Sequence, residues 1–292
     1  MAALPRKILI YGRNFHARAA FRKLEESPEA WHVMGFVEKS AGHPAKEFLG
    51  KRIFTPAELS LIDFDSIVIA GRYTNEMRTA ILQSGVASAK IWEMKRSEYQ
   101  PTETAMHQRS EQTYATLKDL LCILKNQGLE HWFVASSLLA LKRNQDLAWF
   151  ADVDIAVPYE KLEDLHSALQ VSGLFHSVDA LRHAANGAFW KEGKVFQITI
   201  QSTSILQFSE PAIIDIHALH ILDNKAFYNL TDTSFLTVDS AHFMGHQTLR
   251  YGDLELNVPV DGERYLQATY GENWQVPAEL FNANDHVGRV NW

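Results

Sequence analysis

Four short apolar runs alternate with helical patterns along the first hundred positions of the chain. The runs cover residues 7–11, 32–37, 65–70 and 89–93, and the helical patterns cover 15–26 and 75–84. A short apolar run is typical of a buried strand, and strands that alternate with helices form parallel sheets. We therefore predict that residues 1–96 form a Rossmann-like domain with a doubly wound parallel sheet.

The polarity of the chain changes near residue 100. Residues 97–104 are polar and contain a proline, which is typical of a linker, and a long amphipathic helix is predicted at 103–126. With 292 residues, the chain also exceeds the usual size of one domain. We therefore predict an α/β protein with a linker at 97–104 and a second domain, of α+β type, over residues 105–292.

Two carboxylates alternate with apolar residues in segment 149–157, which is predicted to be a β-strand. They belong to Asp152 and Asp154. Side chains two positions apart on a strand point to the same face, so both carboxylates would share one half-buried surface. Two such anions repel each other and lose hydration, and a divalent cation is a common compensation. The pattern therefore predicts a site for Mg²⁺ or Mn²⁺.

A turn of small residues precedes these aspartates and opens a helix. The hydroxyl groups of Ser136 and Ser137, with the free N–H groups of the helix start, would donate hydrogen bonds to a phosphate. A third carboxylate, Asp215, lies in a later β-branched run, and three carboxylates can hold the metal ions of an in-line displacement. This order of turn, helix and Asp-x-Asp strand is found in nucleotidyltransferase folds. We predict that fold for the second domain.

The turn after the first predicted strand keeps part of a dinucleotide-binding sequence. Gly12 is the one glycine of the fingerprint that is present, Asn14 tolerates unusual backbone angles, and Glu38 stands where an acid would meet a ribose. These three residues are candidates for binding a dinucleotide or a nucleotide-sugar. The alternative is a domain that uses this fold for docking or regulation. NAD-dependent chemistry is the least favoured interpretation.

Composition limits the partners of the chain. The formal net charge is −7 and the basic residues are scattered, which argues against a nucleic-acid partner. The single cysteine, Cys122, excludes an internal disulfide and fits a cytoplasmic protein. Because no apolar run approaches the length of a membrane span, any membrane association is predicted to be peripheral.

Four ordered blocks of the second domain resemble the LicD and fukutin-like phosphotransferase family. They are the Ser-Ser-Leu-Leu-Ala turn at 136–140, the Asp-Val-Asp strand at 152–154, the Ile-Asp-Ile run at 214–216, and a closing segment at 254–277 with Val-Pro, Tyr-Leu and Tyr-Gly-x-x-Trp. The resemblance implies a metal-dependent transferase. It would move a phospho-alcohol, such as phosphocholine or ribitol phosphate, from a CDP-linked donor to a glycan hydroxyl and release CMP.

The resemblance also implies roles for single residues. Asp152 and Asp154 would ligate metal, and Asp215 would complete the site or help to deprotonate the acceptor hydroxyl. Ser137 and Arg143 would meet the donor phosphate. Arg143 could alternatively pair with a surface carboxylate.

Two further residues are candidates for contacts with substrate. Trp149 could stack on the donor, with packing beside the strand as the alternative. His217 lies two residues from Asp215, on the same predicted face, and could reach substrate or metal. The chain departs from the family where Ser136 and Ala140 replace usual glycines and where 150–151 replaces an acidic run. A non-catalytic protein that binds a nucleotide or nucleotide-sugar, and nucleotidyl transfer from an NTP, are therefore the alternatives.

Overall fold

A computed structural model describes most of the chain, in two compact units. The described residues are 5–13, 15–25, 27, 31–38, 47–70, 74–99, 103–150, 152–203, 211–229, 234–276 and 286–291. The first unit runs to Thr102 and the second begins at Glu103. This division falls within the linker that the sequence predicts.

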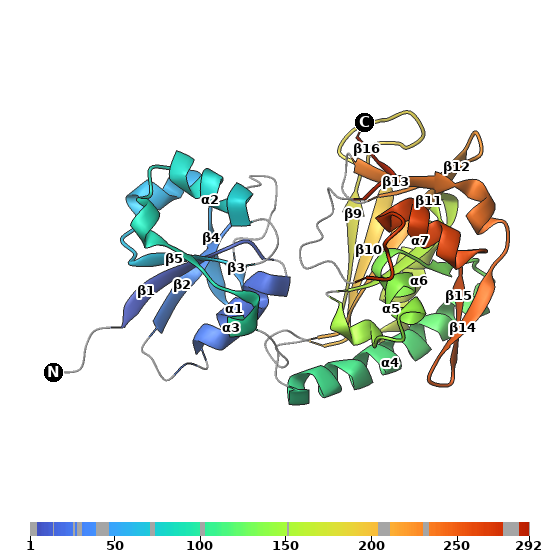
Figure 1. The fold of residues 1–292 in the computed structure, drawn as a ribbon, viewed down its shortest axis with the longest axis horizontal. Coiled ribbons are helices and arrows are strands. Elements are labelled where there is room, and N and C mark those ends of the chain that lie inside the picture. Colours follow the sequence, from blue (N-terminus) through green and yellow to red (C-terminus); the bar gives the residue numbers. More distant parts are fainter. Residues whose placement is uncertain are drawn as a thin grey trace. The chain divides into compact units, whose positions relative to one another are not determined.

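The first unit is built on a six-stranded sheet that is parallel except at one edge (Figure 1). Its order is β3-β4-β2-β1-β5-β6, and only β3 runs antiparallel to its neighbour. The bounds are β1 Arg6–Tyr11, β2 Trp31–Val37, β3 Glu47–Phe48, β4 Lys51–Phe54, β5 Ser66–Ile69 and β6 Ile91–Glu93. The predicted parallel sheet is confirmed. The sequence did not indicate β3 and β4, because β3 has only two residues and β4 begins with two basic residues instead of an apolar run.

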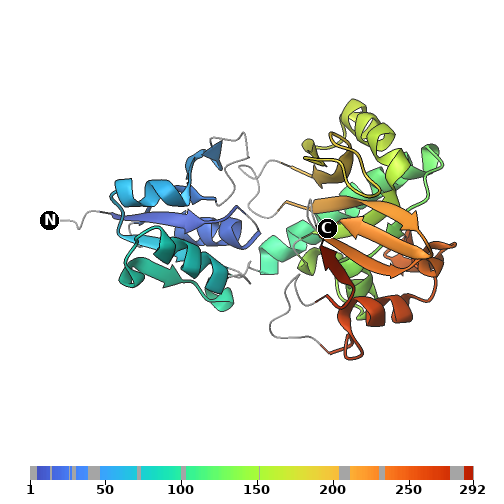
Figure 2. The same ribbon diagram turned by 90° about the horizontal axis from the view of Figure 1, so that it is seen from above.

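Helices cover both faces of this sheet, because the strands are apolar on both sides. The helical segments are α1 Phe15–Glu25, η1 Pro56–Leu61, α2 Thr74–Gln83, η2 Ser88–Lys90 and α3 Arg96–Tyr99. Ile8 and Ile10 of β1 pack with α1 and α3, whereas Leu9 packs with η1 and α2 on the opposite face. Figure 2 shows the strands of the first unit from above, together with its helices. Helix α3 occupies part of the predicted linker, and its Tyr99 is buried. The polar composition of this segment concealed a helix of one turn.

The second unit contains a mixed sheet of eight strands. The path β16-β13-β12-β11-β10-β9 is extended by β8, which pairs with β11, and by β7, which pairs with β8. The bounds are β7 Trp132–Phe133, β8 Val153–Pro158, β9 Ser177–Arg182, β10 Val195–Gln201, β11 Ile213–Leu222, β12 Lys225–Asn229, β13 Ser234–Asp239 and β16 Arg289–Asn291. The pair of β8 and β11 is parallel, and every other pair in this sheet is antiparallel.

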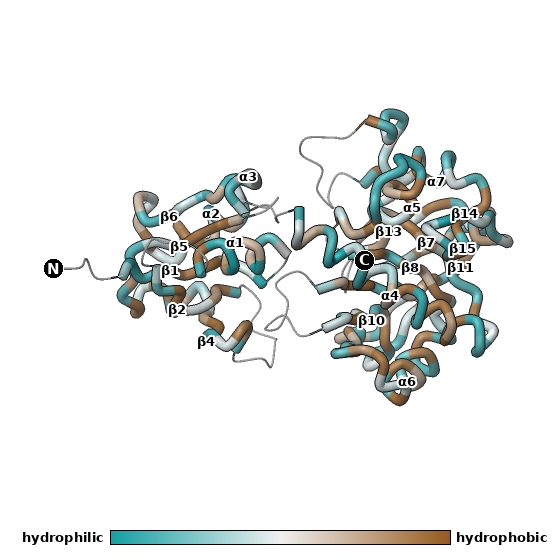
Figure 3. The backbone as a smooth tube through the Cα atoms, turned by 90° about the horizontal axis from the view of Figure 1, so that it is seen from below, coloured by the Kyte–Doolittle hydropathy of each residue, from teal (hydrophilic) through white to brown (hydrophobic). Residues whose placement is uncertain are grey.

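Helices and a hairpin pack with this sheet around one large apolar core (Figure 3). These elements are α4 Glu103–Asn126, α5 Ala135–Lys142, η3 Leu147–Trp149, η4 Tyr159–Lys161, α6 Leu162–Ser172, η5 Ser240–Phe243, the hairpin of β14 Gln247–Tyr251 and β15 Leu254–Val258, and α7 Gly262–Tyr270. The long helix predicted at 103–126 is confirmed as α4. None of the helices in the described ranges is long and apolar enough to cross a bilayer.

The strand predicted at 149–157 is shorter in the structure. Residues 147–149 form the 3₁₀ turn η3, whose N-cap residue Asp146 accepts the N–H of Ala148, and β8 begins only at Val153. Asp152 therefore lies just before the strand rather than within it. Alternation of apolar and polar residues does not distinguish a strand from a capped turn that leads into one.

Candidate functional site

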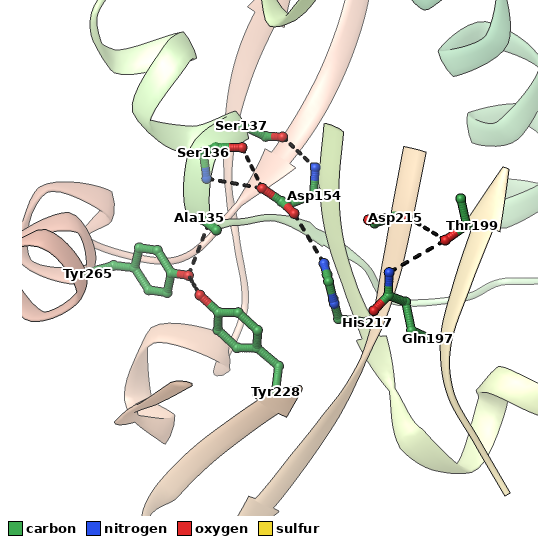
Figure 4. A network of polar contacts seen from close by, with 10 residues as sticks. All are labelled: Ala135, Ser136, Ser137, Asp154, Gln197, Thr199, Asp215, His217, Tyr228 and Tyr265. Carbon is green, nitrogen blue, oxygen red and sulfur yellow. Dashed lines mark hydrogen bonds and ion pairs between the residues drawn. The ribbon is translucent and has the colours of Figure 1, made fainter. Parts of the chain in front are cut away.

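The parallel pairing of β8 with β11 brings the predicted carboxylates together. Asp154 of β8 lies directly opposite Asp215 of β11, and Asp152 precedes Asp154 by two residues. Residues opposite each other on neighbouring strands share a face of the sheet, about 5 Å apart. Figure 4 shows the side chains of Asp154 and Asp215 on this face. The structure thus gathers three carboxylates that lie up to 63 positions apart in sequence.

Burial of these carboxylates disfavours their charged forms. Burial, together with the charges of Asp154 and Asp215, raises the pKa of Asp152 from 3.8 to about 8. Burial also raises the pKa of Asp215, although His217 and a hydrogen bond from Thr199 oppose the shift. Without a cation in the cluster, burial and the neighbouring charges therefore favour the protonated form of Asp152.

His217 supplies positive charge to the same cluster. It lies two residues after Asp215 on β11, and its Nε2 atom is 3.1 Å from Oδ1 of Asp154. Burial alone would lower the pKa of His217, but the hydrogen bond to Asp154 and the charges of the three carboxylates outweigh burial and raise this pKa. The imidazolium form is therefore favoured, and it offsets part of the negative charge.

The predicted serine turn closes directly onto Asp154. The N–H and Oγ groups of Ser136 donate to Oδ2 of Asp154, at 3.2 and 2.5 Å. Oγ of Ser137 accepts the N–H of Asp154, at 2.7 Å. The groups predicted to hold a phosphate thus lie beside the carboxylates, and in this structure the Asp154 carboxylate takes up the Ser136 donors.

The sequence did not single out two polar residues of β10 that support the third carboxylate. Oγ1 of Thr199 donates to Oδ1 of Asp215 at 2.6 Å, and Nε2 of Gln197 approaches Oγ1 of Thr199 at 3.5 Å (Figure 4). Polar residues at 197, 199 and 201 alternate with apolar ones in β10. This alternation was the available signal for a polar strand face beside Asp215.

Arg143 lies away from this cluster. It follows the last residue of α5, at the opposite end of the helix from Ser136. Its Nη2 donates to the backbone carbonyls of Trp274 and, at 3.1 Å, Val276. An eight-residue helix is about 12 Å long, so the guanidinium holds the C-terminal segment rather than facing the serine turn. Phosphate contact by Arg143 stays a prediction with no geometric support.

Trp149 ends η3, three residues before Asp152, and its side chain is 68% exposed. The alternative interpretation, packing beside the strand, does not describe this side chain, because most of its surface is open. An exposed indole is available for stacking on a ligand. The proposed contact with a donor remains a prediction.

The candidate nucleotide site of the first unit is described in part. Gly12 has φ +88°, in the left-handed region that glycine adopts without strain, and its N–H donates to the carbonyl of Val37 at 2.7 Å. The carboxylate of Glu38 pairs with Nε of Arg13 at 3.2 Å. Asn14 lies outside the described residues. Glu38 would have to share its carboxylate between Arg13 and a ribose.

A preformed metal centre is not present in the described part of the chain. No group of three or more His, Cys, Asp or Glu side chains there is arranged to hold an ion. The physical reason is that the carboxylate oxygens face protein donors: Asp154 faces Ser136 and His217, and Asp215 faces Thr199. Carboxylates are suitable ligands for Mg²⁺, but here they would have to exchange these hydrogen bonds for a cation.

Comparison with known proteins identifies one family model, which covers the first unit only. Residues 4–92 match the model described as "C2185-like, N-terminal". The comparison with curated proteins found no match. Three similar solved structures are a lincomycin-bound lincosamide antibiotic adenylyltransferase, LnuA, a scyllo-inositol dehydrogenase from Lactobacillus casei, and a biliverdin reductase from Synechocystis sp. PCC 6803.

These structural similarities are distant. The adenylyltransferase is 11% identical, with coverage of 56% of this chain and 84% of its own, at a TM-score of 0.33. The dehydrogenase is 12% identical, with coverage of 94% of this chain and 87% of its own, at a TM-score of 0.26. The reductase is 14% identical, with coverage of 92% of each chain, at a TM-score of 0.25. We draw no conclusion about activity from similarities at this level.

The assignment to the LicD and fukutin-like phosphotransferases is wrong. The family model that matches the chain is a different one, and it ends at residue 92, before the second unit. The closing segment that carried much of the resemblance is explained by packing, because Val258, Tyr265 and Trp274 are all core residues. Any strand followed by a helix at this place would need apolar or aromatic residues at such positions.

Proposed function

We propose that the second unit is a nucleotide-dependent transferase of the nucleotidyltransferase type, which transfers a nucleotidyl group from an NTP to a hydroxyl group. The observation that carries the proposal is the pairing of Asp154 with Asp215 on parallel strands, beside the Ser136 N–H at the start of α5. Carboxylates next to the N-terminus of a helix can bind the cation and the phosphates of one nucleotide once the phosphate replaces Asp154 as the acceptor of the Ser136 N–H.

In this mechanism the cation enters with the nucleotide. Mg²⁺ or Mn²⁺ would supply charge neutralisation at the phosphates, held by Asp152, Asp154 and Asp215. Mg²⁺ commonly binds proteins through one or two carboxylates plus substrate phosphates. A cation that arrives with the nucleotide is consistent with a cluster whose oxygens are hydrogen-bonded to protein groups before the nucleotide binds. Ser136, released from Asp154, would donate its N–H and hydroxyl to a phosphate oxygen.

The acceptor hydroxyl would attack the α-phosphorus, and the bond from this phosphorus to the bridging oxygen would break, releasing pyrophosphate. The proton of the acceptor must go to a base. Asp215 is the candidate base, because burial raises its pKa above the ordinary value, whereas Asp152 is favoured in its protonated form. Oγ1 of Thr199 donates to Oδ1 of Asp215 and so orients this carboxylate.

Transfer of a phospho-alcohol from a CDP-linked donor to a glycan remains a second candidate. It was inferred from the family resemblance, and with that assignment overturned it is supported only by the same carboxylates. A non-catalytic role in nucleotide binding is the third. The ligand of the first unit is left as a nucleotide or a docking partner.

Binding and product analysis test these proposals. We expect one of ATP, GTP, CTP and UTP to bind in calorimetry with Mg²⁺ and not with EDTA, and to release pyrophosphate when hydroxyl-bearing sugars are supplied. Asp154→Asn should abolish both, whereas Asp164→Asn, an exposed aspartate on α6, is the matched control and should change neither. Release of CMP from CDP-choline would instead identify phospho-alcohol transfer. Binding without turnover would support the non-catalytic role, and metal-independent binding would refute the assignment of the carboxylates.

A further inference from the structure

The first residue of α5 has an unusual backbone conformation for its side chain. Ala135 has φ +45°, in the left-handed region that a residue with a Cβ atom rarely adopts. This conformation costs roughly 1–2 kcal/mol for an alanine. It sets the direction of the next peptide, whose N–H, on Ser136, points at Asp154. The geometry of the serine turn therefore depends on a backbone state that Ala135 does not favour by itself.

A buried tyrosine holds this backbone state. The N–H of Ala135 donates to Oη of Tyr265 at 3.2 Å, and Oη of Tyr228 lies 2.5 Å from Oη of Tyr265 (Figure 4). Tyr265 comes from α7 and Tyr228 from β12, and both side chains are almost completely buried. The first N–H groups of a helix have no partner within the helix, so Tyr265 supplies one for Ala135.

Packing alone does not require these two hydroxyl groups. A phenylalanine fills nearly the same volume as a tyrosine, and burying a hydroxyl group is costly unless it is hydrogen-bonded. Burial raises the pKa of Tyr265 to about 12, so its hydroxyl stays neutral at physiological pH. The two hydroxyl groups are thus neutral and hydrogen-bonded to each other, and Tyr265 accepts the N–H of Ala135.

We propose that Tyr265, supported by Tyr228, is a positioning residue that keeps Ala135 left-handed and so presents the Ser136 N–H to a nucleotide phosphate. The inference rests on the proposed function, because it needs the serine turn to bind phosphate. When Tyr265 loses its hydroxyl, the turn can relax to a conformation that alanine prefers. The apparent affinity then falls in proportion to the fraction of molecules in which the turn keeps the conformation that binds phosphate.

The test measures binding of the Mg²⁺ complexes of the four common NTPs to the full chain. For the nucleotide that the wild type binds, Tyr265→Phe should weaken affinity about 5- to 30-fold, which is the cost of a left-handed alanine converted to a ratio. Tyr228→Phe leaves the acceptor of Ala135 in place and should weaken affinity less than about threefold. Circular dichroism verifies that each variant is folded.

Glycine at position 135 distinguishes positioning from packing. Because glycine adopts positive φ freely, Ala135→Gly should restore most of the affinity to Tyr265→Phe, although it adds no contact. Hydrogen exchange at the amide of residue 135 should be faster in Tyr265→Phe and should stay fast in the double variant, since the acceptor is still missing. A merely structural role for Tyr265 would give no rescue by glycine.

The outcomes separate the inference from the proposed function. Failure of the wild type to bind any of the four complexes would overturn the proposed function, and the inference with it. Wild-type binding together with undiminished affinity in folded Tyr265→Phe would overturn the inference alone. Weakened binding that Ala135→Gly does not restore would also overturn it, because the lost hydroxyl would then act through something other than the backbone of Ala135.

Discussion

Replacing Asp152 by asparagine should stabilise the protein, and the gain should grow as the pH rises from about 4 to about 8. The pKa of Asp152 is raised from 3.8 to about 8, first by burial and then by the charges of Asp154 and Asp215. The folded state therefore binds a proton that the unfolded state has lost. The contribution of this proton to the free energy of unfolding is complete below pH 3.8, the pKa of the aspartate in the unfolded state. It is lost as the pH rises to the pKa of Asp152 in the folded state.

The magnitude follows from these two pKa values. Each pH unit between them costs about 1.4 kcal/mol, so at pH 7 the aspartate destabilises the folded protein by about 4 kcal/mol relative to pH below 4. Asparagine has nearly the same shape and no ionisable group, so it should recover much of this loss. Its amide can also donate to a neighbouring carboxylate.

Urea unfolding in EDTA, at pH 5, 7 and 8, measures the effect. The difference in free energy of unfolding between Asp152→Asn and wild type should be about 1–2 kcal/mol at pH 5 and should rise by about 2 kcal/mol or more by pH 7. Asp164→Asn, on the exposed surface of α6, should show no pH-dependent difference. A stability gain that is independent of pH, or a loss of stability at pH 7, would refute the reasoning that burial and charge repulsion act on Asp152.

Three further substitutions test other parts of the second unit. His220→Phe should make the protein less sensitive to acid. Burial lowers the pKa of His220 to about 3, so the wild-type free energy of unfolding should fall by about 3 kcal/mol from pH 7 to pH 4. An equal fall of the free energy of unfolding in the variant would contradict this. Trp149→Ala should leave the melting temperature nearly unchanged, because the side chain is 68% exposed. If the indole stacks on a base, calorimetry should show nucleotide binding weakened about tenfold. Arg143→Ala should cost about 1–3 kcal/mol of stability, because the contacts to the carbonyls of Trp274 and Val276 are lost. The nucleotide Kd should stay within about twofold of the wild-type value. A large loss of affinity with unchanged stability would instead support phosphate contact by Arg143.

The site could be predicted from sequence where one strand carried the signal. Asp152 and Asp154 were found because alternation along a strand fixes the face of each side chain. Asp215 was found because its β-branched neighbours also indicate a strand. The supporting groups were not found. Thr199 and Tyr265 contact the site because distant segments pack beside it, and the local signal for Thr199, the polar alternation of β10, does not name Asp215 as its neighbour.

The family resemblance failed for a related reason. Its closing segment consists of residues that pack in the core, such as Tyr265 and Trp274, and such residues recur wherever a strand and a helix close a domain. Short motifs of packing residues therefore carried less information on ancestry than their order indicated. Arg143 shows the same limit, since an arginine after a helix is suited to a phosphate or to backbone carbonyls, and only the position of residues 274–276 decides between them.

The sequence alone determined the parallel sheet of the first unit and the long helix α4, because periodicity is a local property of the chain. Only the tertiary structure decided that β8 lies parallel to β11, with Asp154 opposite Asp215, and that Ser136 and His217 occupy the Asp154 oxygens. It also decided that the hydroxyl of Tyr265 accepts the N–H of Ala135. Register, partner choice and burial depend on contacts between segments far apart in the chain, and these contacts fix the charge, the pKa values and the donors of the site.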